Sequence, residues 1–227
     1  MNKNNYNPEL SYNVQKFQSA HDEKKFGEIC LSGGGSSLLR TKFIIKNLSY
    51  VIQKYKIKTM CDVPCGCMNW MPTVIKNNNI DKYYGIEGSE ISIQNCYKQI
   101  KEFNLKNAEI IKADMRNAEI PKVDLIFERD SVQHNSFFSV KLFLENILKS
   151  GSTYLLISNN SQRKRGNKDI KDGGMRRINL LNSPFNFPEP LETLDEQGEN
   201  YSERKLGHKK WNLLYKLSAL RNTIHNI

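Results

Sequence analysis

The strongest constraint on the fold is a regular alternation of short apolar segments with amphipathic segments between residues 38 and 158. Apolar, β-prone runs typical of buried strands occur at 59–63, 82–86, 108–112, 123–127 and 153–157. Segments with helical spacing of apolar residues occur at 38–55, 70–76, 89–103 and 137–148. Strands that alternate with helices predict a parallel sheet with right-handed crossovers. The expected fold class is therefore α/β, Rossmann-like and doubly wound.

The regular alternation ends near residue 158, and the composition changes there. Residues 159–177 are polar and basic, whereas the chain from residue 178 onward is rich in Pro, Phe and Leu. We expect this last third to complete the sheet as a hairpin and to cover a site at its edge.

Composition excludes several classes of protein. No apolar run approaches the roughly 20 residues that cross a bilayer, and the first ten residues have no apolar segment typical of a secretory signal. The five cysteines form an odd set, which favours free thiols in a reducing, cytoplasmic compartment. Their one cluster, Cys61, Cys65 and Cys67, lacks the spacing of a zinc or iron–sulfur site. We therefore expect no metal and no membrane.

Acidic residues end three successive predicted strands: Asp62, Glu87 and Asp114. In a doubly wound sheet, ligands bind beyond the carboxyl ends of the strands. An acid after the second strand accepts ribose hydroxyls, and an acid after the third can accept from an exocyclic amine. Gly66 in the first turn lets the backbone approach a ligand closely. These positions predict a site for a nucleoside-containing cofactor.

The turn after the first strand resembles the first motif of the class I S-adenosylmethionine-dependent methyltransferases, D/E-x-G-x-G-x-G. Asp62 and Gly66 match this motif, whereas Pro64 and Met68 stand where glycines are usual. The run from Asp62 through Asn69-Trp70-Met71 is similar to a variant found among small members of the family. The resemblance covers roughly residues 38–158. It implies a mostly parallel, seven-stranded sheet in the order 3-2-1-4-5-7-6 and S-adenosyl-L-methionine as the cofactor.

The resemblance also implies roles for individual residues. Asp62 would contact the methionine part, Glu87 would hold the ribose, and Asp114 would hold the adenine amine. The other expected cofactor-binding residues are Pro64, Cys65, Gly66, Trp70, Gly88, Met115 and Arg129. The pattern of segments along the chain predicts an N-terminal cap with a Gly-rich loop (1–37) and a single domain (38–227), with a cofactor-binding half (38–158) and a substrate-side part (159–227).

Two other interpretations remain open. A dinucleotide-dependent dehydrogenase would need the G-x-G-x-x-G turn, and the second and third of these glycines are missing here. A Rossmann-like module that binds a partner without catalysis is the other, since a fold alone does not define a function.

The candidate catalytic residues follow the fourth predicted strand: Arg129, Asp130 and His134. If this stretch is one helical turn, Asp130 and His134 share a face. The imidazole of a histidine is suited to take a proton from a hydroxyl near neutral pH. Asp130 would orient the imidazole, bind a substrate hydroxyl or act as the base itself, and Arg129 would bind an acidic substrate group or pair with an acid.

The acceptor is less constrained than the cofactor. The fourth strand is not followed by the N/D-P-P-Y/F motif expected for methylation of a base amine. The first hypothesis is O-methylation of a sugar hydroxyl on a glycan or nucleotide sugar. An apolar wall for the sugar ring would come from four aromatic residues, Phe185, Phe187, Trp211 and Tyr215, unless they simply pack in the core. The second is methylation of an RNA ribose 2′-hydroxyl, which uses the basic run 163–177 and a Lys-Asp-Lys-Glu tetrad to which Asp130 and Lys164 would contribute. A net charge of +10 leaves RNA open, although a small-molecule or glycan acceptor is favoured.

Overall fold

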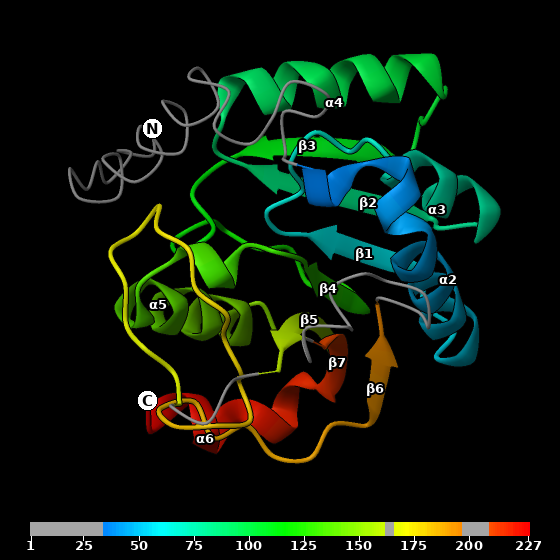
Figure 1. The fold of residues 1–227 in the computed structure, drawn as a ribbon. Coiled ribbons are helices and arrows are strands. Elements are labelled where there is room, and N and C mark those ends of the chain that lie inside the picture. Colours follow the sequence, from blue (N-terminus) through cyan, green and yellow to red (C-terminus); the bar gives the residue numbers. More distant parts are fainter. Residues whose placement is uncertain (1–33, 162–165, 197–208) are drawn as a thin grey trace, which may run out of the picture.

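The computed structural model describes residues 34–161, 166–196 and 209–227. At its centre lies a seven-stranded sheet in the order β3-β2-β1-β4-β5-β7-β6 (Figure 1). The strands are β1 (Thr59–Asp62), β2 (Lys82–Glu87), β3 (Ala108–Lys112), β4 (Leu125–Glu128), β5 (Tyr154–Asn160), β6 (Glu192–Asp195) and β7 (Lys210–Lys216). The first five are parallel, and β7 lies antiparallel between β5 and β6. The expected strand order and fold class are confirmed.

Helices cover both faces of the sheet. They are α2 (Leu38–Lys54), α3 (Met71–Asn77), α4 (Glu90–Glu102), α5 (Phe137–Lys149) and α6 (Arg221–His225), with short 3-10 turns η1 (Gly34–Ser36), η2 (Val132–His134) and η4 (Leu217–Leu220). Helices α2, α3 and α4 share one apolar core with one face of the sheet, whereas α5 and α6 share a second core with the other face (Figure 1). Among the described residues, no helix combines the length and the apolar character that a membrane span requires.

Capping serines begin the two helices that follow β2 and β4, α4 directly after β2 and α5 after the short turn η2. Ser89 caps α4 by accepting a hydrogen bond from Ser92 N, and Ser136 caps α5 by accepting one from Ser139 N. A serine at this position satisfies an amide that the helix itself leaves unpaired. The residues just before each cap are therefore held in place between a strand and a helix.

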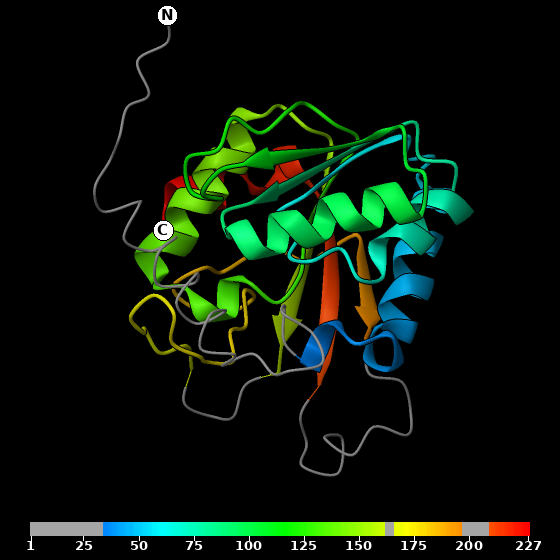
Figure 2. The same cartoon turned by 90° about the horizontal axis from the view of Figure 1, so that it is seen from above.

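The far edge of the sheet is joined to the first described helix. The amide of Asn47 in α2 donates to Asp195 O at 2.8 Å, and the hydroxyl of Tyr55 donates to Glu192 Oε1 at 2.9 Å. Figure 2 shows α2 beside β6 in the view from above. This contact brings η1, which precedes α2, to the carboxyl edge of the sheet.

Candidate active site

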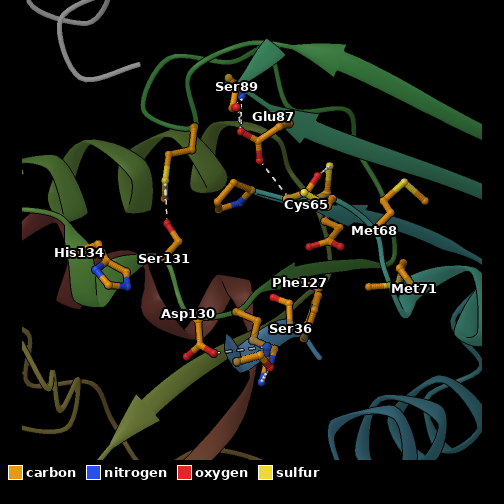
Figure 3. A pocket seen from close by; sticks show the side chains of 18 of the residues that line it. Ser36, Cys65, Met68, Met71, Glu87, Ser89, Phe127, Asp130, Ser131 and His134 are labelled. Carbon is orange, nitrogen blue, oxygen red and sulfur yellow. Dashed lines mark hydrogen bonds and ion pairs between the residues drawn. The ribbon is translucent and has the colours of Figure 1, made fainter. Parts of the chain in front are cut away.

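A cavity of about 280 Å³ lies at the carboxyl ends of β1, β2 and β4 (Figure 3). All of the expected cofactor-binding and catalytic residues line it: Asp62, Pro64, Cys65, Gly66, Trp70, Glu87, Gly88, Asp114, Met115, Arg129, Asp130 and His134. Gly35 and Ser36 of η1 also line it. The fold thus brings residues from five separate chain segments to one cavity.

The loop after β1 contains two left-handed residues, although Pro64 and Met68 stand where two glycines are usual. Gly66 has a φ of +56° and Met68 has a φ of +53°, so both occupy the left-handed region. The side chain of Met68 is only 2% exposed and packs in the same apolar core as Met71. Core packing therefore holds Met68 in a conformation that glycine adopts without strain.

The same loop lies tightly on β2. Cys65 N donates to Ile86 O at 3.0 Å, which places the Cys65 side chain over Gly85. A Cβ atom at Gly85 would lie 2.8 Å from both Cys65 Sγ and Ile110 Cδ1. Glycine is thus needed at this position for the loop to approach the strand.

Replacing Gly85 by alanine is expected to lower the free energy of unfolding by about 1–3 kcal/mol, the usual cost of overpacking a core. The Gly85→Ala/Cys65→Ala double variant removes the clashing sulfur and should recover part of the loss. Urea unfolding of the two variants and the wild type measures both effects. Equal stabilities of the single and double variants would show that the cysteine contact is not the cause.

Glu87 ends β2 and holds the loop after β1. Its Oε2 accepts a hydrogen bond from Gly66 N at 2.9 Å, and its Oε1 accepts from Gly88 N and Ser89 N at 2.9 and 2.8 Å. Burial raises the pKa of this carboxyl, and the three backbone donors act in the opposite direction. Because Oε2 has one backbone donor and Oε1 has two, Oε2 is the oxygen better able to accept a ligand hydroxyl.

Asp62 ends β1 at the floor of the cavity, where only 4% of the residue is exposed. The hydroxyl of Tyr83 donates to its Oδ2 at 3.0 Å. Burial holds the pKa of Asp62 well above its ordinary value, and the nearby carboxyls of Glu128 and Glu87 act in the same direction. A cationic ligand group beside Asp62 would therefore stabilise its charged form.

Asp114, after β3, is held by an arginine that the sequence analysis did not single out. Arg116 Nε donates to Asp114 Oδ1 at 2.9 Å, and Arg116 Nη2 donates to Asp114 Oδ2 at 2.6 Å. Such a two-point contact fixes the plane of the carboxylate. In the sequence, the only indication of this contact is that an aspartate and an arginine stand two residues apart.

A compact group of four charged side chains adjoins the cavity, and we call it the charge cluster: Arg129, Asp130, Glu196 and Lys210. Arg129 Nη2 lies 2.5 Å from Glu196 Oε1, and Arg129 Nη1 lies 3.3 Å from Asp130 Oδ2. Lys210 Nζ lies 2.6 Å from Asp130 Oδ2 and 2.5 Å from Glu196 Oε1. Two cations and two anions thus neutralise one another, and Lys210 and Arg129 lower the pKa of Asp130 to about 2.

The stretch from Asp130 to His134 is not one helical turn, so the condition under which the two residues would share a face is not met. Asp130 has a φ of +62°, outside the helical region, and η2 begins only at Val132. Figure 3 shows the side chains of Asp130 and His134 lying apart. Asp130 therefore contacts Arg129 and Lys210, and the two candidate catalytic residues do not share a helix face.

Glu128, at the end of β4, holds this turn from beneath. Its Oε1 accepts hydrogen bonds from Ser131 N and Val132 N at 2.7 and 3.0 Å, and its Oε2 accepts from Ser158 N and Oγ at 3.2 and 3.1 Å. The residue is fully buried, and burial raises its pKa to about 7. The carboxyl of Glu128 thus joins the loop that carries the candidate catalytic residues to β5.

His134 Nδ1 lies 2.8 Å from the carbonyl oxygen of Gly174. A carbonyl oxygen only accepts, so this contact assigns a proton to Nδ1, and in the neutral imidazole Nε2 is then the accepting nitrogen. The side-chain nitrogen of Gln133 lies 3.4 Å from Nε2, in keeping with a donor there. This is the tautomer that a general base needs if Nε2 is to take a proton.

No family model matches the chain, and no curated protein matches it. Solved structures do match. Magnesium protoporphyrin IX methyltransferase (ChlM) from Synechocystis PCC 6803, with bound SAM, has a TM-score of 0.57 at 12% identity, over 94% of this chain and 100% of that chain. The DhpI–SAH complex has a TM-score of 0.55 at 8% identity, over 91% and 96%. The chain has the class I methyltransferase fold.

The same fold occurs in a protein with another reaction. The [4+2]-cyclase SpnF has a TM-score of 0.58 at 14% identity, over 75% of this chain and 80% of that chain. Since one fold accommodates different reactions, the residues of the cavity must indicate the chemistry of this methyltransferase-fold protein.

Other sequence hypotheses are settled differently by the structure. Phe185, Phe187 and Tyr215 are buried in the core on the α5 side and do not line the cavity, so they are packing residues. Arg176 is 8% exposed and stacks on the ring of Phe137 at 4.9 Å, so it does not belong to a basic surface. Lys164 and its neighbours at 162–165 lie outside the described residues.

Proposed function

We propose that this protein is an S-adenosylmethionine-dependent methyltransferase that methylates a hydroxyl group, with His134 as the general base. One observation carries the proposal. Asp62 and Glu87, which end β1 and β2, and Asp114, two residues after β3, line the same cavity as a histidine whose Nε2 is the accepting nitrogen. The cofactor, when bound, supplies a methyl group on a positively charged sulfur, and the residues of the chain position the two reactants.

The residues of the cavity fit that cofactor. Burial raises the pKa of Asp62 although Arg129 acts in the opposite direction, and the ammonium or sulfonium group of the cofactor would further stabilise the charged carboxylate. Glu87 Oε2 would accept a ribose hydroxyl, and Asp114, fixed in its plane by Arg116, would accept from the adenine amine. Gly66 would let the backbone lie close to the cofactor.

Of the two candidate bases, the electrostatics favour His134. A carboxylate with a pKa of about 2 that accepts from Lys210 and contacts Arg129 is a weak base at neutral pH. Asp130 is better suited to accept a hydrogen bond from the acceptor molecule. Arg129, paired with Glu196, would shape the wall of the cavity rather than take part in proton transfer.

We further propose that the acceptor is a sugar hydroxyl of a glycan or nucleotide sugar. Gln133 and Asn135 line the cavity together with Asp130 and His134. Amide and carboxylate side chains are the groups that hydrogen-bond to sugar hydroxyls. Localised donors and acceptors, rather than a long charged surface, then set the specificity.

One observation favours a second acceptor, the ribose 2′-hydroxyl of RNA. The charge cluster combines two acidic and two cationic side chains, as the Lys-Asp-Lys-Glu tetrad does. Arg129 stands in place of one of the two lysines. RNA binding by this protein would weaken steeply with salt, because phosphate contacts release counterions. Salt-insensitive or undetectable binding of a capped RNA oligonucleotide would remove this alternative.

Calorimetric titration with S-adenosylmethionine and S-adenosylhomocysteine tests the cofactor. The wild type is expected to bind both, and Glu87→Ala should weaken binding by about 10- to 100-fold, the value of a hydrogen bond to a charged group. Glu90→Ala is the matched control, because its side chain is 52% exposed at the start of α4 and pairs with Lys112. Absence of binding to the wild type would instead favour the module that binds a partner without catalysis.

A further inference from the structure

The carbonyl that contacts His134 belongs to a short turn, residues 171–174, that lies against η2. Gly173 N donates to His134 O at 2.8 Å, and Arg176 N donates to Gln133 O at 3.0 Å. Besides the Gly173 bond, the contact of His134 Nδ1 with Gly174 O at 2.8 Å joins the turn to η2, and the Arg176 bond joins the residues just after the turn to η2. The histidine is thus held through both its backbone and its ring.

The shape of this turn depends on two adjacent glycines. Gly173 has a φ of +79°, in the left-handed region that side chains disfavour. A Cβ atom at Gly174 would lie 2.9 Å from Lys171 O, which accepts a hydrogen bond from Gly174 N at 3.0 Å. The turn is therefore narrow, and its geometry fixes the direction of the Gly174 carbonyl.

Asp172 connects the turn to the start of α5. Its Oδ1 accepts a hydrogen bond from Ser136 N at 2.6 Å, and its Oδ2 accepts from Ser139 Oγ at 2.8 Å. Arg116 Nη1 lies 3.7 Å from the same Oδ2. Ser136, the N-cap of α5, follows His134 by only two residues. The start of α5 therefore holds both the histidine, through the chain, and the turn, through Asp172.

We propose that Asp172 is a positioning residue for His134. By binding the start of α5, it keeps Gly174 O against Nδ1 of the imidazole and thereby keeps Nε2 as the nitrogen that accepts a proton. A role of Asp172 in catalysis rests on the proposed function, whereas its effect on the His134 tautomer can be measured on the protein alone. Arg116, which contacts both Asp114 and Asp172, links the acid expected at the adenine amine to the residue that positions the base.

The tautomer is measured by two-bond ¹H–¹⁵N correlation spectra of protein labelled with [¹⁵N]histidine, without cofactor or acceptor, and His134→Gln identifies the His134 signals. The wild type is expected to show a protonated Nδ1 and an unprotonated Nε2. Asp172→Ala should lower the Nδ1–H fraction by about twofold or more, because the imidazole loses the acceptor that selects this tautomer. Met175→Ala is the control, since Met175 directly follows Gly174 in the chain and its side chain is 73% exposed.

Two results would overturn the proposal: a protonated Nε2 in the wild type, or wild-type ring shifts in Asp172→Ala. If Asp172→Ala does not fold, Asp172→Asn replaces it, because an asparagine keeps an oxygen for Ser136 N but removes the charge that faces Arg116. A smaller decrease of the Nδ1–H fraction of His134 is then expected, and unchanged ¹⁵N chemical shifts of the His134 ring would overturn the proposal. Failure of the wild type to bind S-adenosylmethionine would reject the proposed function and leave the tautomer result standing.

Discussion

Replacing His134 by alanine is expected to lower kcat for methyl transfer by about 10²- to 10⁴-fold, the usual contribution of a general base. The reason is that Nε2 is the accepting nitrogen of the ring, because Nδ1 donates to Gly174 O. Affinity for S-adenosylhomocysteine should stay within about twofold of the wild type, since a ring that acts on the acceptor adds little to cofactor binding. Mass-spectrometric detection of methyl transfer to a sugar acceptor, together with calorimetry, measures both quantities.

The control for this variant is His225→Ala. His225 is exposed at the end of α6, within the helical layer away from the cavity, and its loss should change neither quantity. Substantial turnover by His134→Ala would show that another group takes the proton or that none is needed. Loss of cofactor affinity in the same variant would instead indicate a disturbed cavity.

Replacing Glu128 by alanine is expected to destabilise the protein by about 3 kcal/mol at pH 5, because buried donors left without an acceptor cost about 1–3 kcal/mol each. The affected donors are the amides of Ser131, Val132 and Ser158. Glu128→Gln keeps one acceptor oxygen and should lose less. Urea unfolding of the three proteins measures the differences.

The same carboxyl predicts a pH dependence. Its pKa in the folded protein is about 7, above the ordinary value of 4.5, so the folded state binds more protons than the unfolded state between these values. Its contribution to stability is therefore fully present below about pH 4.5 and is lost as the pH rises through 7. The stability difference between the wild type and Glu128→Gln should shrink over this window. A constant difference from pH 4.5 to 8 would contradict the raised pKa.

Periodicity and strand ends allowed much of this fold to be predicted from the sequence. Each parallel strand is an apolar run followed by a turn, so the acids Asp62, Glu87 and Asp114 were identified by position alone. Their shared cavity follows from the geometry of parallel strands, whose carboxyl ends meet at one edge. The position of His134 at this edge could be predicted in the same way, because His134 follows β4 closely in the sequence.

The contacts that sequence analysis missed depend on tertiary structure. Glu196 and Lys210 are distant in sequence from Asp130, and only the pairing of β6 and β7 brings them to it. No helical turn joins Asp130 to His134, and the buried carboxyl of Glu128 binds the amides of Ser131 and Val132 within this stretch. Local spacing contains no information about such a hydrogen-bond acceptor.

The position of β7 decides where this protein can be divided. A fragment ending at residue 158 would leave β5 with a bare edge of apolar residues, because Leu155 and Ile157 pair with Tyr215 and Leu213 of β7. Unpaired edges of this kind promote aggregation. The charge cluster would also lose Glu196 and Lys210, which would leave Arg129 and Asp130 with only each other among its members. The part of the chain up to residue 158 and the part after it are therefore not interchangeable modules, because β7 completes the edge that β5 presents.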